Sequence, residues 1–322
     1  MPSHKNEKHP VKMNKTKTSR SGKFALLGSL LGLTGSAPAT LYIYEPFDYA
    51  PTAGVNNGAS LGDGNQSGGL GLGTWTQTNT GSNEIDVRDG GLSFTDGGGN
   101  ELPVVGNAME RAQRVGQAAV SSPIDSNATI SLTQDNSTMW MTFLYRDRGF
   151  SGPDFGIGLH TENMIGNDNQ TIAAAGYGVG FGINSTSGPA RNIGTIVYNN
   201  SADFTRVVEA TPTFDGPSAS NIFLLAMKVN WNPEGTPDEI FVFNVTDLTT
   251  EPDESSALAS DTFDFTLAQQ NSLDVFNISE TQVADVDEVR VATTFAEAVG
   301  VPEPSSLVFL GMAGLPLLRR RR

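Results

Sequence analysis

Between residues 40 and 298 the apolar side chains recur at every second position, and this spacing restricts the fold more than any other feature. In residues 221–231, positions 223, 225, 227, 229 and 231 are all apolar, whereas Lys228 and Asn230 lie between them. A period of two is that of a β-strand whose two faces differ. No stretch of this body keeps a helical apolar stripe for more than about two turns. The pattern therefore predicts an all-β chain.

Three strands are the most clearly marked. Residues 137–145 are apolar on both faces, which predicts a central strand covered on both sides. Residues 239–245 resume the alternation after the turn-forming segment 232–237, so they and residues 221–231 are expected to form a hairpin. Further strands are expected at residues 41–47, 84–88, 92–95, 128–132, 193–198, 262–267 and 287–293.

Short strands joined by Gly, Asn, Asp and Pro clusters predict a two-sheet antiparallel jelly-roll sandwich. We expect one such domain over residues 40–300, with no internal boundary. The glycine-rich runs 62–73 and 97–100 are expected to be surface loops. A signal helix and a short apolar helix are expected to flank the sandwich.

Charge and cysteine content exclude several classes of function. Residues 37–318 hold nine basic and 34 acidic residues, a formal charge of −25. Such a body repels phosphate backbones, which argues against nucleic-acid binding. The chain has no cysteine, which excludes disulfides, thiolate metal sites and cysteine nucleophiles.

The first 39 residues have the order of a signal peptide. A basic segment, residues 1–23, precedes ten apolar residues, 24–33, and a bilayer span takes about 20. Ala37 and Ala39 then provide a small-x-small cleavage pattern, so the mature chain is expected to begin near Thr40. Met13 is an alternative initiator to Met1.

The last 22 residues have a matching three-part order. A Pro-Glu-Pro triplet is followed by an apolar run, residues 307–318, and by four arginines. An apolar run with a basic stop indicates transient membrane insertion, because 12 residues are short for a permanent anchor. The residues of the triplet and of the basic cluster are Pro302, Glu303, Pro304, Arg319, Arg320, Arg321 and Arg322.

This tail resembles the PEP-CTERM sorting signal. The resemblance implies processing by an exosortase at the triplet. It also implies delivery to the cell envelope, the cell surface or an exopolysaccharide matrix, with C-terminal membrane anchorage before processing. An ordinary short tail anchor is the alternative reading, and it does not account for the triplet.

The body resembles the concanavalin A-like, laminin-G-like lectin and glucanase sandwiches. The matching segments are residues 44–49, residues 225–231 with 238–242, and residues 287–295. The resemblance implies a curved sheet that holds glycans or proteins, with or without calcium. It implies no particular activity.

Glycine alternates with apolar residues in two segments, 155–159 and 177–183. If these strands pair, their glycines would form one smooth patch that a sugar ring or another backbone can approach closely. Tight packing beneath a covering loop is the alternative. The glycines are Gly156, Gly158, Gly176, Gly178, Gly180 and Gly182.

Two further sets of residues suggest chemistry. Glu84 and Asp86 match the first two positions of the Glu-x-Asp-x-x-Glu motif of laminarinase-type glycosidases, which the body resembles, but Arg88 or Asp89 stands where a second Glu is needed. The alternative is a solvated charged strand face. His160, the only histidine after residue 39, is expected to be a loop or rim residue.

Oxygen-rich turns offer calcium ligands, although they are also ordinary turn sequences. The candidate ligands are Asp63, Asn65, Asp96, Asn100 and Asp168. Without a complete catalytic set, a non-enzymatic exported protein that binds polysaccharide weakly or serves structurally is the leading hypothesis. A glycoside hydrolase or lyase and a self-associating matrix protein are the alternatives.

Overall fold

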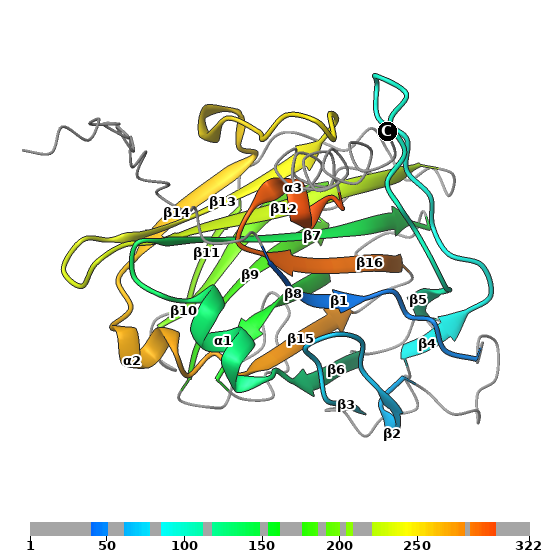
Figure 1. Ribbon diagram of the computed structural model, residues 1–322, viewed down its shortest axis with the longest axis horizontal. Coiled ribbons are helices and arrows are strands. Elements are labelled where there is room, and N and C mark those ends of the chain that lie inside the picture. Colours follow the sequence, from blue (N-terminus) through cyan, green and yellow to red (C-terminus); the bar gives the residue numbers. More distant parts are fainter. Residues whose placement is uncertain are drawn as a thin grey trace, which may run out of the picture. The chain divides into compact units, whose positions relative to one another are not determined.

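Two antiparallel sheets account for the strands of the computed structural model (Figure 1). The structure describes residues 40–50, 61–77, 85–111, 118–148, 154–161, 176–185, 191–199, 204–208, 221–280 and 284–300. The predicted all-β, two-sheet sandwich is confirmed. The expected signal peptide, sorting tail and flanking helices lie outside the described residues.

The first sheet has eight strands. Seven follow one another in space, and β1 (Leu41–Glu45) pairs with β16 beside them. The order of the seven is β14 (Ala259–Phe263), β13 (Asp238–Val245), β12 (Ile222–Trp231), β7 (Ser137–Asp147), β16 (Ala284–Ala292), β5 (Ala108–Arg111) and β4 (Ile85–Arg88).

The second sheet also has eight strands. Their order is β11 (Phe204–Val208), β10 (Arg191–Asn199), β9 (Tyr177–Ser185), β8 (Asp154–His160), β15 (Val275–Glu280), β6 (Ala118–Pro123), β3 (Thr74–Gln77) and β2 (Asp63–Ser67). The alternating apolar residues of both sheets meet in one inner core between them.

Strand β7 confirms the prediction of a strand covered on both sides. Met139, Met141 and Phe143 belong to the inner core. Trp140 and Leu144 point the other way, into an outer core on the far face of the first sheet. Helix α3 (Phe295–Ala298), which lies over that face in Figure 1, helps to cover this outer core. The predicted hairpin is confirmed as β12 and β13.

The strand expected at residues 128–132 is wrong, because these residues form helix α1 (Ser126–Leu132). Asp125 caps the helix by accepting a hydrogen bond from the Asn127 backbone N–H at 2.8 Å. Its buried residues Ala128, Thr129 and Leu132 lie on one helical face. The β-branched residues suggested a strand, but the cap and this packing decide for a helix.

Two other expected strands also need correction. Residues 92–95 form a covering segment with one isolated bridge, and Leu92 packs into the outer core. Strand β14 ends at Phe263, and Thr266 caps the short helix α2 (Leu267–Gln270) through a capping box with Gln269.

The glycine-rich run 62–73 is not simply a surface loop. It contains β2 and then passes close to β1, where a Cβ on Gly69 would lie 2.0 Å from the Tyr44 carbonyl oxygen. Glycine is needed there because two backbones nearly touch. No helix in the described ranges is long and apolar enough to cross a membrane.

Candidate functional site: the glycine face of the second sheet

The two glycine-alternating segments are neighbouring strands, β8 and β9. Their antiparallel register places Gly156 opposite Gly182 and Gly158 opposite Gly180. The intervening residues Phe155, Ile157, Leu159, Val179, Phe181 and Ile183 all point into the inner core. The glycines therefore share the face of the second sheet that points away from this core. The predicted pairing is confirmed, and the paired glycines do share one face. They are buried, so an open patch and its contact with a ligand remain predictions.

Close backbone approach accounts for part of the glycine pattern. A Cβ on Gly158 would lie 2.3 Å from the Val179 carbonyl oxygen, and one on Gly180 would lie 2.7 Å from that of Ile157. No side chain fits at either distance. Gly176, just before β9, is similarly close to the Thr161 hydroxyl, at 2.7 Å. This geometry supports the packing interpretation at these positions.

Gly178 is glycine for a different reason, because it faces a side chain. It lies opposite His160 in the register, and a Cβ there would come within 2.1 Å of His160 Nδ1. The imidazole therefore rests on the bare backbone of β9. His160 is only 6% exposed, so the expectation of a loop or rim histidine is wrong.

The strands on either side of β8 and β9 complete a narrow pocket above the glycines. Strand β10 contributes Ile196 and Tyr198, and the Tyr198 ring centroid lies 5.4 Å from that of His160. Strand β15 contributes Asn277 and Ser279, which lie opposite Gly158 and Gly156. The lining residues are Gly156, Ile157, His160, Ile196, Tyr198, Asn277 and Ser279.

Two polar atoms of this pocket have no hydrogen-bond partner in the described part of the chain. They are His160 Nδ1 and Asn277 Nδ2, and both residues are more than nine-tenths buried. Burial lowers the pKa of His160 to about 3, so its ring is neutral at physiological pH. Since buried polar groups normally find partners, this pair is suited to receive a small polar group from outside.

Sequence reasoning found the glycines of this pocket but missed Tyr198 and Asn277. Tyr198 ends a predicted strand, and Asn277 lies in a strand that was not predicted. Neither has a local signal, because their meeting depends on β15 and β10 flanking the glycine pair.

The proposed carboxylate pair is only partly described. Glu84 lies outside the described residues. Asp86 lies opposite Glu110 of β5 and is 3% exposed, so the solvated-face interpretation is wrong for Asp86. Arg88, on the same strand, reaches Asp285 at 3.1 Å. Asp86 and Arg88 therefore border a network of partly buried ion pairs, and a catalytic role of Glu84 and Asp86 stays a prediction.

Asp285 is the centre of that network. Besides Arg88, it accepts from Arg146 Nε at 2.6 Å and from Arg148 Nε at 3.0 Å. Arg148 also pairs with Glu110 at 2.6 Å. These contacts join β4, β5, β7 and β16, which is a structural role.

The neighbouring acids of β16 connect loops to the first sheet. Asp287 accepts from the Leu92 backbone N–H at 2.7 Å, and burial raises its pKa to about 8. Glu288 accepts from the Tyr44 hydroxyl and the Val105 backbone N–H.

Glu45 anchors the segment 44–49 to the rest of the sandwich. Its buried carboxylate accepts hydrogen bonds from the Phe47 and Gly69 backbone N–H groups, the Tyr49 hydroxyl and the Trp75 indole. Four donors on one carboxylate fix the chain where it enters the sandwich.

Among the calcium candidates, the structure describes the side chains of Asp96 and Asn100, which contact each other. The Asp96 carboxylate accepts from the backbone N–H groups of Leu248, Gly98 and Asn100 and from the Asn100 side chain. The Leu248 bond, followed by the others, lowers the Asp96 pKa to about 2. The side chains of Asp63 and Asn65, and all of Asp168, lie outside the described set.

No group of three or more His, Cys, Asp or Glu side chains in the described ranges is placed to hold a metal ion. Calcium binding remains a prediction.

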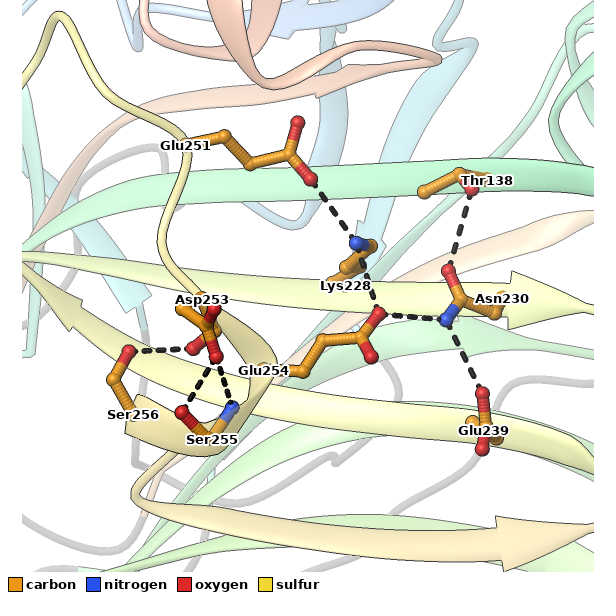
Figure 2. Close-up of polar contacts among 9 residues, drawn as sticks. All are labelled: Thr138, Lys228, Asn230, Glu239, Glu251, Asp253, Glu254, Ser255 and Ser256. Atoms are coloured by element: carbon orange, nitrogen blue, oxygen red, sulfur yellow. Dashed lines mark hydrogen bonds and ion pairs between the residues drawn. The ribbon is translucent and has the colours of Figure 1, made fainter.

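A second polar surface lies on the outward face of the first sheet. Lys228 of β12 pairs with Glu251 and Glu254, each at 3.0 Å (Figure 2). Its Nζ also lies 5.3 Å from the Trp140 ring centroid. Asn230 donates to Glu254 at 3.0 Å and to Glu239 at 3.3 Å.

Comparisons with known proteins give no family assignment. No family model matches the chain, and no curated protein matches it. Solved structures with a similar fold include a protein of unknown function from Shewanella oneidensis MR-1, at 10% identity and a TM-score of 0.44, covering 81% of this chain and 90% of that one.

Two further solved structures are of known kinds. A legume lectin-like domain from Entamoeba histolytica has 10% identity and a TM-score of 0.38, with 62% and 95% covered. An alginate lyase from Chlorella virus has 7% identity and a TM-score of 0.37, with 68% and 93% covered. At these values we base no functional argument on the similarities.

Proposed function

We propose that this is an exported protein whose sandwich binds a polysaccharide through the pocket formed by His160, Tyr198 and Asn277. The observation that carries the proposal is the pair of unpartnered atoms, His160 Nδ1 and Asn277 Nδ2, in one pocket above a glycine floor. A sugar hydroxyl both donates and accepts hydrogen bonds, so the hydroxyls of a saccharide can accept from Asn277 Nδ2 and donate to His160 Nδ1.

The other groups of the pocket suit the same ligand. The Tyr198 ring is only 6% exposed, so together with the bare glycine backbone it bounds a space for one small group, such as a single hydroxyl. The pocket is narrow, so it recognises one group of a larger chain rather than enclosing a whole monosaccharide. Weak binding of each sugar unit follows from so small a contact.

The two ends of the chain support a location outside the cytoplasm. We propose that residues 1–39 direct export and are removed, and that residues 301–322 insert transiently in the membrane and are processed at Pro302–Pro304 by an exosortase. The body over residues 40–300 then acts in the cell envelope, at the surface or in the exopolysaccharide layer. Mass spectrometry of the exported protein tests this, because one spectrum reports both termini.

Retention of the purified protein on a panel of polysaccharides, including the producing cell's own exopolysaccharide, tests the binding proposal. Each column is run with calcium and with a chelator. Binding to at least one polysaccharide is expected. Retention on none of them would overturn the proposal and leave a structural, self-associating matrix role.

A polysaccharide lyase is the second candidate function, favoured by a neutral histidine beside a tyrosine. In β-elimination a base removes the proton next to a uronate carboxylate, the glycosidic C–O bond breaks, and an acid protonates the leaving oxygen. In this arrangement His160 would be the base and the Tyr198 hydroxyl the acid. The His160 ring is free to accept a proton, but its pKa of about 3 makes it a weak base. The test is an increase in ultraviolet absorbance as the unsaturated uronate product forms. No increase with any uronate polymer would exclude lyase activity.

A further inference from the structure

Two rows of side chains run across four strands on the outward face of the first sheet. Cross-strand register aligns Trp140, Lys228, Phe241 and Ser260 in one row, from β7 to β14. The neighbouring row aligns Thr138, Asn230, Glu239 and Thr262. Side chains directly opposite one another on a sheet face are in contact range, so the rows form one continuous platform.

One end of this platform is fixed by ion pairs and hydrogen bonds. The segment carrying Glu251 and Glu254 folds back over Lys228, and Asn230 links Glu254 to Glu239 (Figure 2). The Thr138 hydroxyl donates a hydrogen bond to Asn230 Oδ1 at 3.3 Å. The Asn230 hydrogen bond orients the Glu239 carboxylate. The segment with Glu251 and Glu254 borders this side of the platform.

The other end is an open groove. It is lined by Glu239, Phe241, Ser260, Asp261 and Thr262 from β13 and β14. Ser260 and Thr262 are exposed, and no hydrogen bond of either hydroxyl occurs within the described ranges. Phe241 is half-buried, packing on the outer core with part of its ring toward the groove.

We propose that this groove is a second saccharide-binding site. Phe241 offers a ring on which a sugar can stack, Glu239 offers a fixed acceptor, and the two hydroxyls offer donors and acceptors. The ligand class is a neutral saccharide, because Glu239, Glu254 and Asp261 repel uronates and Lys228 is already paired twice.

The position of the groove gives it a consequence for function. It lies on the outward face of the first sheet, whereas the His160 pocket lies on the outward face of the second, with the inner core between them. This inference rests on the proposed function: with both sites occupied, the protein holds two polysaccharide segments at once and cross-links them. Two weak contacts on one body also raise overall retention above that of either alone.

The test compares groove variants with pocket variants in the full-length protein. Phe241→Ala removes the ring, and the double variant Ser260→Ala, Thr262→Ala removes the hydroxyls without touching either core. Ser93→Ala, which removes an exposed hydroxyl between β4 and β5, is the matched control. Binding to a soluble neutral glucan and to alginate is measured by calorimetry, and cross-linking by the viscosity of the glucan solution.

We expect both groove variants to lose affinity for the neutral glucan by about tenfold and to abolish the viscosity increase. The Ser93→Ala control should match the wild type. The groove variants should bind alginate as the wild type does. If Phe241→Ala fails to fold, the double variant alone decides. Wild-type affinity and viscosity in that double variant would overturn the inference.

The outcomes separate this inference from the proposed function. If Asn277→Ala weakens binding about tenfold while the groove variants behave as wild type, the pocket stands and the groove does not. If Asn277→Ala binds as the wild type does and the groove variants are weakened, the groove stands and the pocket does not. Absence of glucan binding by the wild type overturns the groove site outright.

Discussion

The imidazole of His160 lies against the backbone of Gly178 so closely that a Cβ at residue 178 would come within 2.1 Å of Nδ1. This contact joins the packing of the second sheet to the chemistry of its pocket. The glycine makes space for the ring, which lines the pocket and whose Nδ1 has no hydrogen-bond partner in the described part of the chain.

Gly178→Ala should therefore displace His160 and weaken polysaccharide binding. Overpacking of this kind costs about 1–3 kcal/mol of unfolding free energy. Urea unfolding and glucan retention measure the two effects. Gly97→Ala is the control, because a Cβ there would meet no atom nearer than 4.0 Å. Equal stability and binding in the two variants would contradict the close contact.

Asn277→Ala should separate binding from folding. Its Nδ2 has no partner in the described part of the chain, so removing it costs little stability. Loss of one ligand hydrogen bond should weaken binding by about tenfold. Thr74→Ala, an exposed position on β3 of the same sheet, should leave both unchanged. Unaltered affinity of Asn277→Ala in calorimetry would remove Asn277 from the site.

Asp285→Asn should destabilise the first sheet. It leaves Arg88, Arg146 and Arg148 without their shared charge, although these side chains are 17–30% exposed and solvent screens part of the loss. We expect about 2–4 kcal/mol of unfolding free energy to be lost, measured by urea titration. Glu251→Gln, which breaks an exposed pair with Lys228, should cost less than about 1 kcal/mol.

Stability should fall as the pH rises from about 4 to about 8. Burial raises the folded-state pKa of Asp287 to about 8 and that of Asp238 to about 6, above the usual value near 3.8. In this window both carboxyls bind more protons in the folded state than in the unfolded state, so raising the pH favours unfolding, by at most about 1.4 kcal/mol per pH unit for each group. His160, which is neutral in the folded state, acts in the opposite direction below its usual pKa near 6.5 and offsets one of them there.

Urea unfolding at pH 5, 6, 7 and 8 measures this slope. The repulsion of Asp287 by Glu288 and Glu45 acts in the same direction as burial. Asp287→Asn should flatten the profile above pH 7, where Asp238, with its pKa of about 6, has largely titrated. An unchanged slope in that variant would show that Asp287 does not titrate in this range.

The candidate site illustrates the reach of sequence reasoning. Glycine alternation marked both strands of the floor, because period two and missing side chains are visible in a single segment. The sequence predicted a shared glycine face only if the two segments pair, and in the structure they do pair. His160 was noticed but placed at a rim, because one residue's burial depends on strands that lie far from it in the chain.

The strands were unequally visible. Strand β7 was found with both its faces, since apolar residues at consecutive positions require two layers around it. Strands β6 and β15 were missed because their small and polar residues, such as Ser121 and Asn277, do not alternate clearly. Residues 128–132 were assigned to a strand because side-chain branching outweighed the cap at Asp125.

By itself, the sequence determined the all-β class, the hairpin of β12 and β13, the two-sided central strand and the smooth faces of β8 and β9. All of these follow from alternation within one segment. Only the tertiary structure decided that β15 lies between β6 and β8 and that Tyr198 lies beside His160. It also decided that Glu239 of β13 is paired with Thr262 of β14. The reason is that strand pairing joins residues distant in the chain, and a segment's own pattern carries no information about which partner it will find.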